Sequence, residues 1–129
     1  MIAGVAVVAF AQFYLESQAL VDVTWHWIQH GLIAGGGAAV GAGAVRLYQI
    51  GQPRARLHPS VTGSVGLIVV GIGLAVGAQL FVDSLINVSL TWHWLQHGLV
   101  FFGGLAAGEG AYGLYLREQQ RGVAARRPG

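Results

Sequence analysis

The stretch TWHWIQHGL at residues 24–32 occurs a second time as TWHWLQHGL at residues 91–99. With this offset of 67 residues (91 minus 24), residues 11–48 align without a gap on residues 78–115, and 20 of the 38 pairs are identical. Glycine raises that number, but it does not explain the polar pairs Gln12/Gln79 and Glu16/Asp83. The chain is therefore predicted to contain two copies of one unit, repeat one over 1–52 and repeat two over 68–119.

The composition favours a single membrane domain spanning residues 1–129. Of these residues, 54% are hydrophobic and only 9% are charged, and the mean hydropathy is positive. Cysteine is absent, which excludes disulfides and thiolate metal sites. We find no phosphate-binding loop, no nucleophile–base pair and no basic stripe for nucleic acid, so independent hydrolase, kinase or DNA-binding activity is not expected.

Four hydrophobic stretches predict four transmembrane helices, at about 2–20, 24–50, 62–87 and 91–119. Asp22 or Thr24 can cap the second of them. The first stretch lacks the basic start of a signal peptide, and residues 4–20 match the interior residues 71–87, so we expect it to be retained. A linker at 53–67, helical in part, joins the repeats, and a basic tail at 120–129 is expected to be mobile.

The arginines predict the orientation of these helices. All seven basic residues are arginines in or beside the linker and the C-terminal end: Arg46, Arg54, Arg56, Arg117, Arg121, Arg126 and Arg127. Because basic residues accumulate on the cytoplasmic side, both termini and the linker are expected there, in a multi-pass protein of the cell membrane. Two helices per repeat give both repeats the same orientation, related by a pseudo-two-fold axis along the membrane normal. The predicted fold is thus an all-α membrane protein built from a parallel tandem repeat, with the four tryptophans in an outer aromatic belt.

A candidate metal site lies at the outer end of the predicted bundle. His26 and His30 are four residues apart and share a helix face, as do His93 and His97. At ~1.5 Å per residue, Glu16 lies level with the first pair and Asp83 with the second, so each hairpin is expected to supply two histidines and one carboxylate. The pseudo-two-fold can bring both sets together, and four glutamines are candidates for hydrogen bonds to the ligands: Gln12, Gln79, Gln29 and Gln96.

Two other interpretations remain open for these groups. The histidines and carboxylates can instead form a hydrogen-bond network that only locks the hairpins together. Glu109 has no counterpart in repeat one, where Ala42 stands. We favour an ion pair between Glu109 and Arg46 over a proton-relay role for this carboxylate.

The motif His-x-x-Gln-His-x-Leu, present here at residues 26–32 and 93–99, resembles the signature of CtaG-like membrane proteins. Those proteins are associated with copper delivery during assembly of cytochrome c oxidase. The resemblance implies copper as the ion and the four histidines as its ligands. At the second motif position, where that family usually has methionine, this chain has Trp27 and Trp94.

Ligand chemistry alone leaves the ion open among copper, zinc and iron, because all three accept imidazole and carboxylate. Four functions fit: a copper-binding assembly factor or accessory subunit of a copper oxidase or monooxygenase, an electron carrier with one b-type haem, a small transporter, and a structural accessory subunit without metal. The repeat favours a transporter, whereas the lack of a broken helix counts against it. Expected partners are the lipid bilayer and either other membrane subunits or further copies of this chain.

Overall fold

The computed structural model describes residues 1–19, 21–51, 59–82 and 89–125. The elements in chain order are α1 (Ile2–Phe13), α2 (Glu16–Ala19), α3 (Val23–Gly51), α4 (Val61–Gly77), the π-helical turn η1 (Ala78–Val82) and α5 (Leu90–Ala125). Every regular element in these ranges is a helix, which confirms the all-α class.

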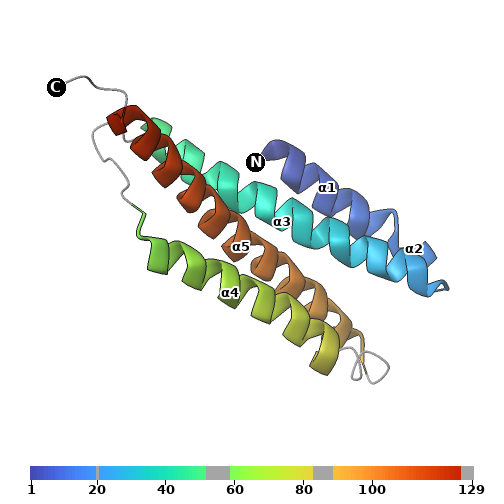
Figure 1. The fold of residues 1–129 in the computed structure, drawn as a ribbon. Coiled ribbons are helices and arrows are strands. Elements are labelled where there is room, and N and C mark those ends of the chain that lie inside the picture. Colours follow the sequence, from blue (N-terminus) through green and yellow to red (C-terminus); the bar gives the residue numbers. More distant parts are fainter. Residues whose placement is uncertain (20, 52–58, 83–88, 126–129) are drawn as a thin grey trace.

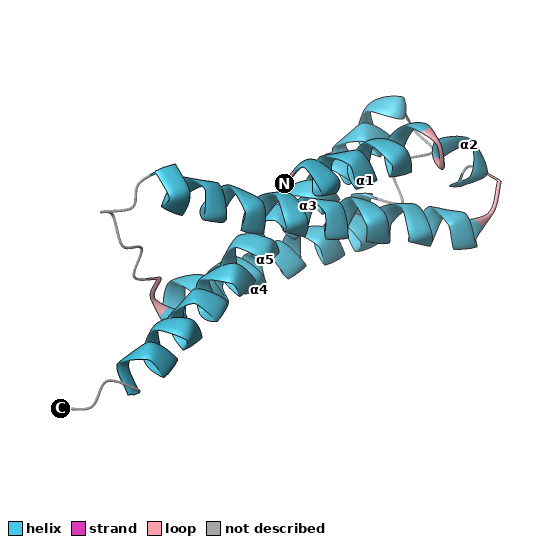
Figure 2. Ribbon diagram, turned by 90° about the horizontal axis from the view of Figure 1, so that it is seen from above, coloured by secondary structure: helices cyan, strands magenta, loops and turns pink. Residues whose placement is uncertain are grey.

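The two long helices α3 and α5 pack against each other at the centre, with α1 beside α3 and α4 beside α5 (Figure 1). Figure 2 shows that the α1–α3 pair crosses the α4–α5 pair at an angle. At one end lie α2 and the beginnings of α3 and α5, with Trp25, Trp27, Trp92 and Trp94; we call it the tryptophan end. At the other, the arginine end, lie the end of α3, the beginning of α4 and the end of α5, with Arg46, Arg117 and Arg121.

Glycines bring the backbones of α3 and α5 into contact. A Cβ atom on Gly37 would overlap the carbonyl oxygen of Phe101, and a Cβ on Gly104 would overlap that of Ala34. Gly41 and Gly108 have the same relation to Leu105 and Ala38. These four glycines therefore stand where the backbones of α3 and α5 approach most closely among the contacts described. Small residues that allow close backbone approach are typical of helix packing in lipid, where no hydrophobic effect drives helices together.

Few large side chains fill the interior. The buried apolar cluster consists of Ala11, Ile33, Ala78 and Val100. Two helices, Val61–Val82 and Leu90–Val123, are long and apolar enough to cross a membrane, by length and composition; Ile2–Phe13 is apolar but shorter. Much of the apolar surface of α4 faces outward, including Val69, Val70 and Ile72. A soluble monomer rarely exposes apolar surface on this scale, so lipid is a suitable surrounding.

The first helix is interrupted, and an unbroken helix over 2–20 is therefore wrong. α1 ends at Phe13, Tyr14 N donates to Phe10 O at 2.9 Å, and α2 begins at Glu16. In repeat two, α4 passes into the π-helical η1 at the residues aligned with 11–15. Neither proline nor glycine stands at 11–19 to mark the break. Irregular helix turns are frequent at functional sites, and this one adjoins the candidate ligands.

Asp22 caps as expected, and of the remaining helix ends only that of the last helix lies well beyond the expected residue. Asp22 caps α3, because its Oδ1 accepts from Thr24 N at 2.6 Å. Ser60 caps α4, accepting from Gly63 N at 2.9 Å, so the linker at 53–67 is helical from Val61 onward. α5 continues into the basic tail as far as Ala125, because arginine, glutamate, glutamine and alanine all favour helix.

Candidate metal centre

Three side chains at the tryptophan end form a cluster that could hold a metal ion. Glu16 at the start of α2 and His93 and His97 on α5 offer ligand atoms that all lie within 4.8 Å of one another. His93 Nε2 lies 2.7 Å from Glu16 Oε1. Two atoms on one tetrahedral ion at ~2.0–2.1 Å stand roughly 3.3 Å apart, so the widest pair would close by no more than about 1.5 Å. Side-chain rotation can supply that movement.

The cluster joins different repeats, whereas the sequence analysis placed Glu16 with His26 and His30 of its own hairpin. Instead, Glu16 hydrogen-bonds to the last helix across 77 residues of chain. Matched depth fixes the height of a side chain along the bundle, but it does not fix which neighbouring helix that side chain faces. Asp83, the expected carboxylate of repeat two, lies outside the described residues.

Donors surround the carboxylate of Glu16. Gln29 Nε2 donates to Glu16 Oε2 at 2.7 Å, and Gln12 Nε2 lies 3.4 Å from the same oxygen. Gln29 is fully buried, and its Nε2 also donates to the carbonyl oxygen of Ala11 at 3.2 Å. Sequence analysis missed this main-chain acceptor, since no pattern marks a carbonyl near a helix break. With donors on both oxygens, the carboxylate is held in one orientation toward α5.

The hydrogen bond at Nδ1 of His97 determines which nitrogen of this ring can bind a metal ion. His97 Nδ1 lies 2.8 Å from Gln12 Oε1. Because Gln12 Nε2 is turned toward Glu16, its amide oxygen faces the ring and accepts the Nδ1 proton. Nε2 of His97 then carries a lone pair. This atom is buried and has no hydrogen-bond partner within the described residues.

The histidines of both repeats meet in one continuous row. Ring centroids are 4.3 Å apart for His26–His30, 5.0 Å for His30–His97 and 4.3 Å for His93–His97. His30 Nδ1 lies 2.6 Å from Gln79 Oε1, so α4's extension η1 holds His30 much as α1 holds His97. Gln96 is fully buried beside this row. Of the four rings, only that of His26 is half-buried rather than buried.

The tryptophans surround this row on the outside. All four are exposed, at the end where α3 and α5 begin. The ring of Trp94 contacts that of His97, with centroids 6.4 Å apart. Outward-facing indoles at one end of an apolar bundle suit an interfacial belt better than a ligand cage.

Glu109 lies apart from the histidines. It stands twelve positions after His97 on α5, about 18 Å along the helix. No ion pair with Arg46, which is exposed, and no hydrogen bond toward the histidines is found among the described residues. Its Cγ packs 3.2 Å from the point where a Cβ on Gly41 would stand. Glu109 instead faces a separate pocket between α3, α4 and α5.

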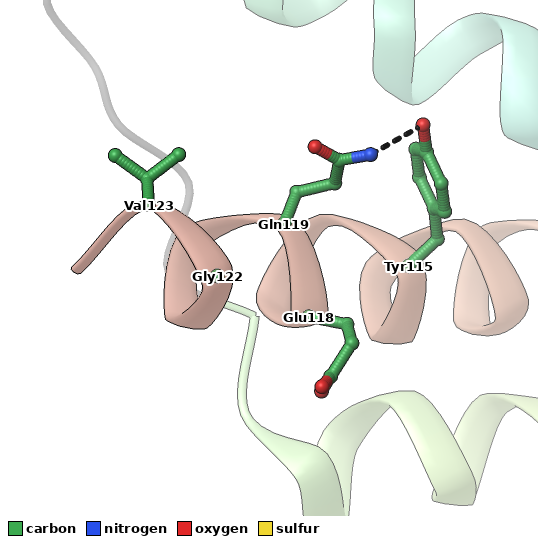
Figure 3. Close-up of a pocket in the computed structure, with 5 residues that line it drawn as sticks. All are labelled: Tyr115, Glu118, Gln119, Gly122 and Val123. Carbon is green, nitrogen blue, oxygen red and sulfur yellow. Dashed lines mark hydrogen bonds between the residues drawn. The ribbon is translucent and has the colours of Figure 1, made fainter. Parts of the chain in front are cut away.

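A further pocket at the end of α5, about 300 Å³ in volume, carries little chemistry. Its lining comes from α5 alone: Tyr115, Glu118, Gln119, Gly122 and Val123 (Figure 3). Gln119 Nε2 donates to the hydroxyl of Tyr115 at 2.9 Å, while Glu118 points away from both and pairs with Arg121 at 3.7 Å. The polar side chains of this pocket, Tyr115, Glu118 and Gln119, thus already have partners.

No protein-family model matches this chain, and no curated protein or solved structure matches it. The fold and the site alone define its class, a small all-helical protein with two helices long and apolar enough to cross a membrane and a cluster of two buried histidines and a half-buried carboxylate.

Proposed function

We propose that this chain is an integral membrane protein with four transmembrane helices, in which the arginine end faces the cytoplasm. The two apolar helices, the outward-facing apolar surface and the arginines at one end of the bundle support this topology. Both termini and the linker would then lie on the cytoplasmic side, and the histidine row would lie near the opposite face.

We further propose that the two repeats are related by a pseudo-two-fold axis between α3 and α5. Support comes from contacts that map onto each other under the offset of 67. The Gln12–His97 bond maps onto the Gln79–His30 bond, and the contact of Gly37 with Phe101 maps onto that of Gly104 with Ala34. Such pairs are expected when two equivalent hairpins face each other.

The site supports a transition-metal centre best, with Glu16, His93 Nε2 and His97 Nε2 as ligands. Two observations carry this proposal: Glu16, His93 and His97 each offer a ligand atom within 4.8 Å of the others, and Nε2 of His97 is buried without a hydrogen-bond partner among the described residues. A buried acceptor without a donor is unfavourable, and a cation relieves it. His93 donates to Glu16, so binding an ion through His93 Nε2 would release that proton.

Copper is the first candidate for the ion. Among divalent first-row ions, Cu²⁺ binds nitrogen and oxygen ligands most tightly, and the resemblance to CtaG-like proteins points the same way. The chain has no cysteine and a single methionine, so it lacks the soft ligands that favour Cu⁺. Buried ligands suit a fixed centre, and we propose a role as assembly factor or accessory subunit of a membrane oxidase or monooxygenase. Zinc and iron are the alternatives.

A purely structural hydrogen-bond network is the second candidate, favoured by the direct 2.7 Å contact between His93 and Glu16. A b-type haem is less suited to this geometry. Its porphyrin would have to separate the rings of His30 and His97, which lie 5.0 Å apart on helices whose backbones touch at Gly37 and Gly104.

Metal analysis of protein purified from its native membrane tests the proposal. We expect bound copper in the natural chain and in the control variant His58→Ala, which removes a histidine of the linker. His97→Ala should lose the metal, and acidification should release it as protons compete for imidazole. A metal-free natural chain, or equal metal in His97→Ala, would favour the structural network, whereas a Soret band would favour haem.

A further inference from the structure

A second pocket lies at the arginine end, about 410 Å³ in volume and far from the histidines. Its walls come from three helices, with Val45 on α3, Leu67 on α4 and Leu116 on α5. Ser64 packs its hydroxyl against Gly113 in this wall, since a Cβ on Gly113 would overlap that oxygen. This volume falls in the range of pockets that bind small organic molecules, ~300–1,000 Å³.

One charged side chain, Glu109, lines this largely apolar pocket. Ser60 Oγ already accepts the hydrogen bond that caps α4. The other described carboxylates all have partners: Glu16 with His93, Asp22 with Thr24 N, and Glu118 with Arg121. Glu109 is half-buried and makes no hydrogen bond or ion pair within the described residues. A partly buried carboxylate without a partner favours a cation beside it.

We propose that this pocket binds an amphiphilic organic cation, an ammonium or phosphonium centre that carries apolar groups. Glu109 would pair with the positive charge, and Val45, Leu67 and Leu116 would cover the apolar groups. A metal ion fits less well, because the lining offers one carboxylate and two hydroxyls where hard cations take six or more oxygen ligands. An anion would be repelled, and a neutral molecule would leave the carboxylate unpaired.

The size and polarity of the pocket set the expected selectivity. Charge complementarity rests on a single carboxylate, so affinity should depend on the sign of the charge and on apolar bulk rather than on a pattern of hydrogen bonds. This inference does not rest on the metal centre, which lies about 18 Å away along α5.

Equilibrium dialysis of the purified full-length chain in detergent tests this proposal. Binding of tetraphenylphosphonium is compared with binding of tetraphenylborate, an anion of the same shape. We expect saturable binding of one phosphonium per chain and none of the borate. Glu109→Gln should weaken binding about tenfold or more through loss of a partly desolvated ion pair. Glu118→Gln, a matched change on the same helix outside this pocket, should leave affinity unchanged.

A second variant keeps the test valid if Glu109→Gln fails to fold. Leu116→Phe narrows the pocket without changing charge and should also weaken binding, while both variants keep the natural metal content. The proposal is overturned if the phosphonium binds equally to the natural chain and Glu109→Gln, if the borate binds as well, or if no binding is detected. Binding that emerges only in Arg46→Ala would also overturn it, by assigning Glu109 to the chain's own arginine.

Discussion

His97 Nδ1 lies 2.8 Å from Gln12 Oε1, although 85 residues separate the two along the chain. The amide of Gln12 bridges this ring and the carboxylate of Glu16, its oxygen toward one and its nitrogen toward the other. The first helix therefore sets the protonation pattern of a histidine on the last helix.

Replacing Gln12 should weaken metal binding even though Gln12 is not a ligand. Gln12→Ala leaves His97 free to place its proton on Nε2, the nitrogen that the ion needs, and loss of such a supporting hydrogen bond lowers affinity by roughly 10–100-fold. Titration calorimetry with Cu²⁺ measures the change. Gln18→Ala, at an exposed position of α2, is the control and should bind as the natural chain does. Equal affinities for both variants would contradict the role of Gln12.

Glu16→Gln should lose the metal and also destabilise the fold. The carboxylate accepts from His93 and Gln29, whereas an amide presents one donor group to one of these donors. A buried clash of donors lowers the free energy of unfolding by about 1–3 kcal/mol. Chemical denaturation in detergent measures this loss, with the exposed Glu118→Gln as control. Unchanged stability would mean that the hydrogen bonds around Glu16 contribute nothing.

Several features of this molecule could be predicted from the sequence, because the tandem repeat and the helical spacing of its residues determine them. The spacing of His26 and His30 gives a shared helix face, and their rings do lie 4.3 Å apart. The repeated glycines Gly37 and Gly104 likewise occupy equivalent places in the contact between α3 and α5, where only hydrogen at Cα permits the observed approach.

Two features could not be predicted from the sequence: the direction in which each side chain points around its helix axis, and the break in the first helix. Depth along a helix follows from residue number, but whether Glu16 faces its own hairpin or α5 depends on how helices rotate about their axes when they pack. The break after Phe13 has no proline or glycine to mark it. Tertiary contacts accompany it, among them the burial of Leu15 and the hydrogen bonds that Gln12 and Gln29 donate to Glu16.

Adding one methyl group to Gly37 should destabilise the bundle by roughly 1–3 kcal/mol or more, because the new Cβ would meet the carbonyl oxygen of Phe101. Gly35→Ala is the matched control, since nothing lies within 4 Å of a Cβ at that position. The control should be neutral or slightly stabilising, as alanine favours helix over glycine. Thermal unfolding in detergent compares the two. Tolerance of Gly37→Ala would show that α3 and α5 can separate without loss.

Single cysteines should report the proposed topology, since the natural chain contains none. Asp22→Cys, between α2 and α3, should react with an impermeant thiol reagent added outside intact cells. Gln120→Cys, near the end of α5, should react only after the membrane is opened, because the arginine end faces the cytoplasm. Labelling of Gln120→Cys from outside would contradict the proposed orientation and favour the opposite one.

The contacts of Gln12 and Glu16, near the start of the chain, with histidines of the last helix have a consequence for biosynthesis. Glu16 leaves the ribosome 77 residues before His93, and until α5 exists its carboxylate has no imidazole of that helix to meet. A nascent chain therefore cannot bring Glu16, His93 and His97 together before α5 has been made. Under the proposed function, loading of the ion would be the final step of maturation, and a chain truncated before α5 would lack two of the three proposed ligands.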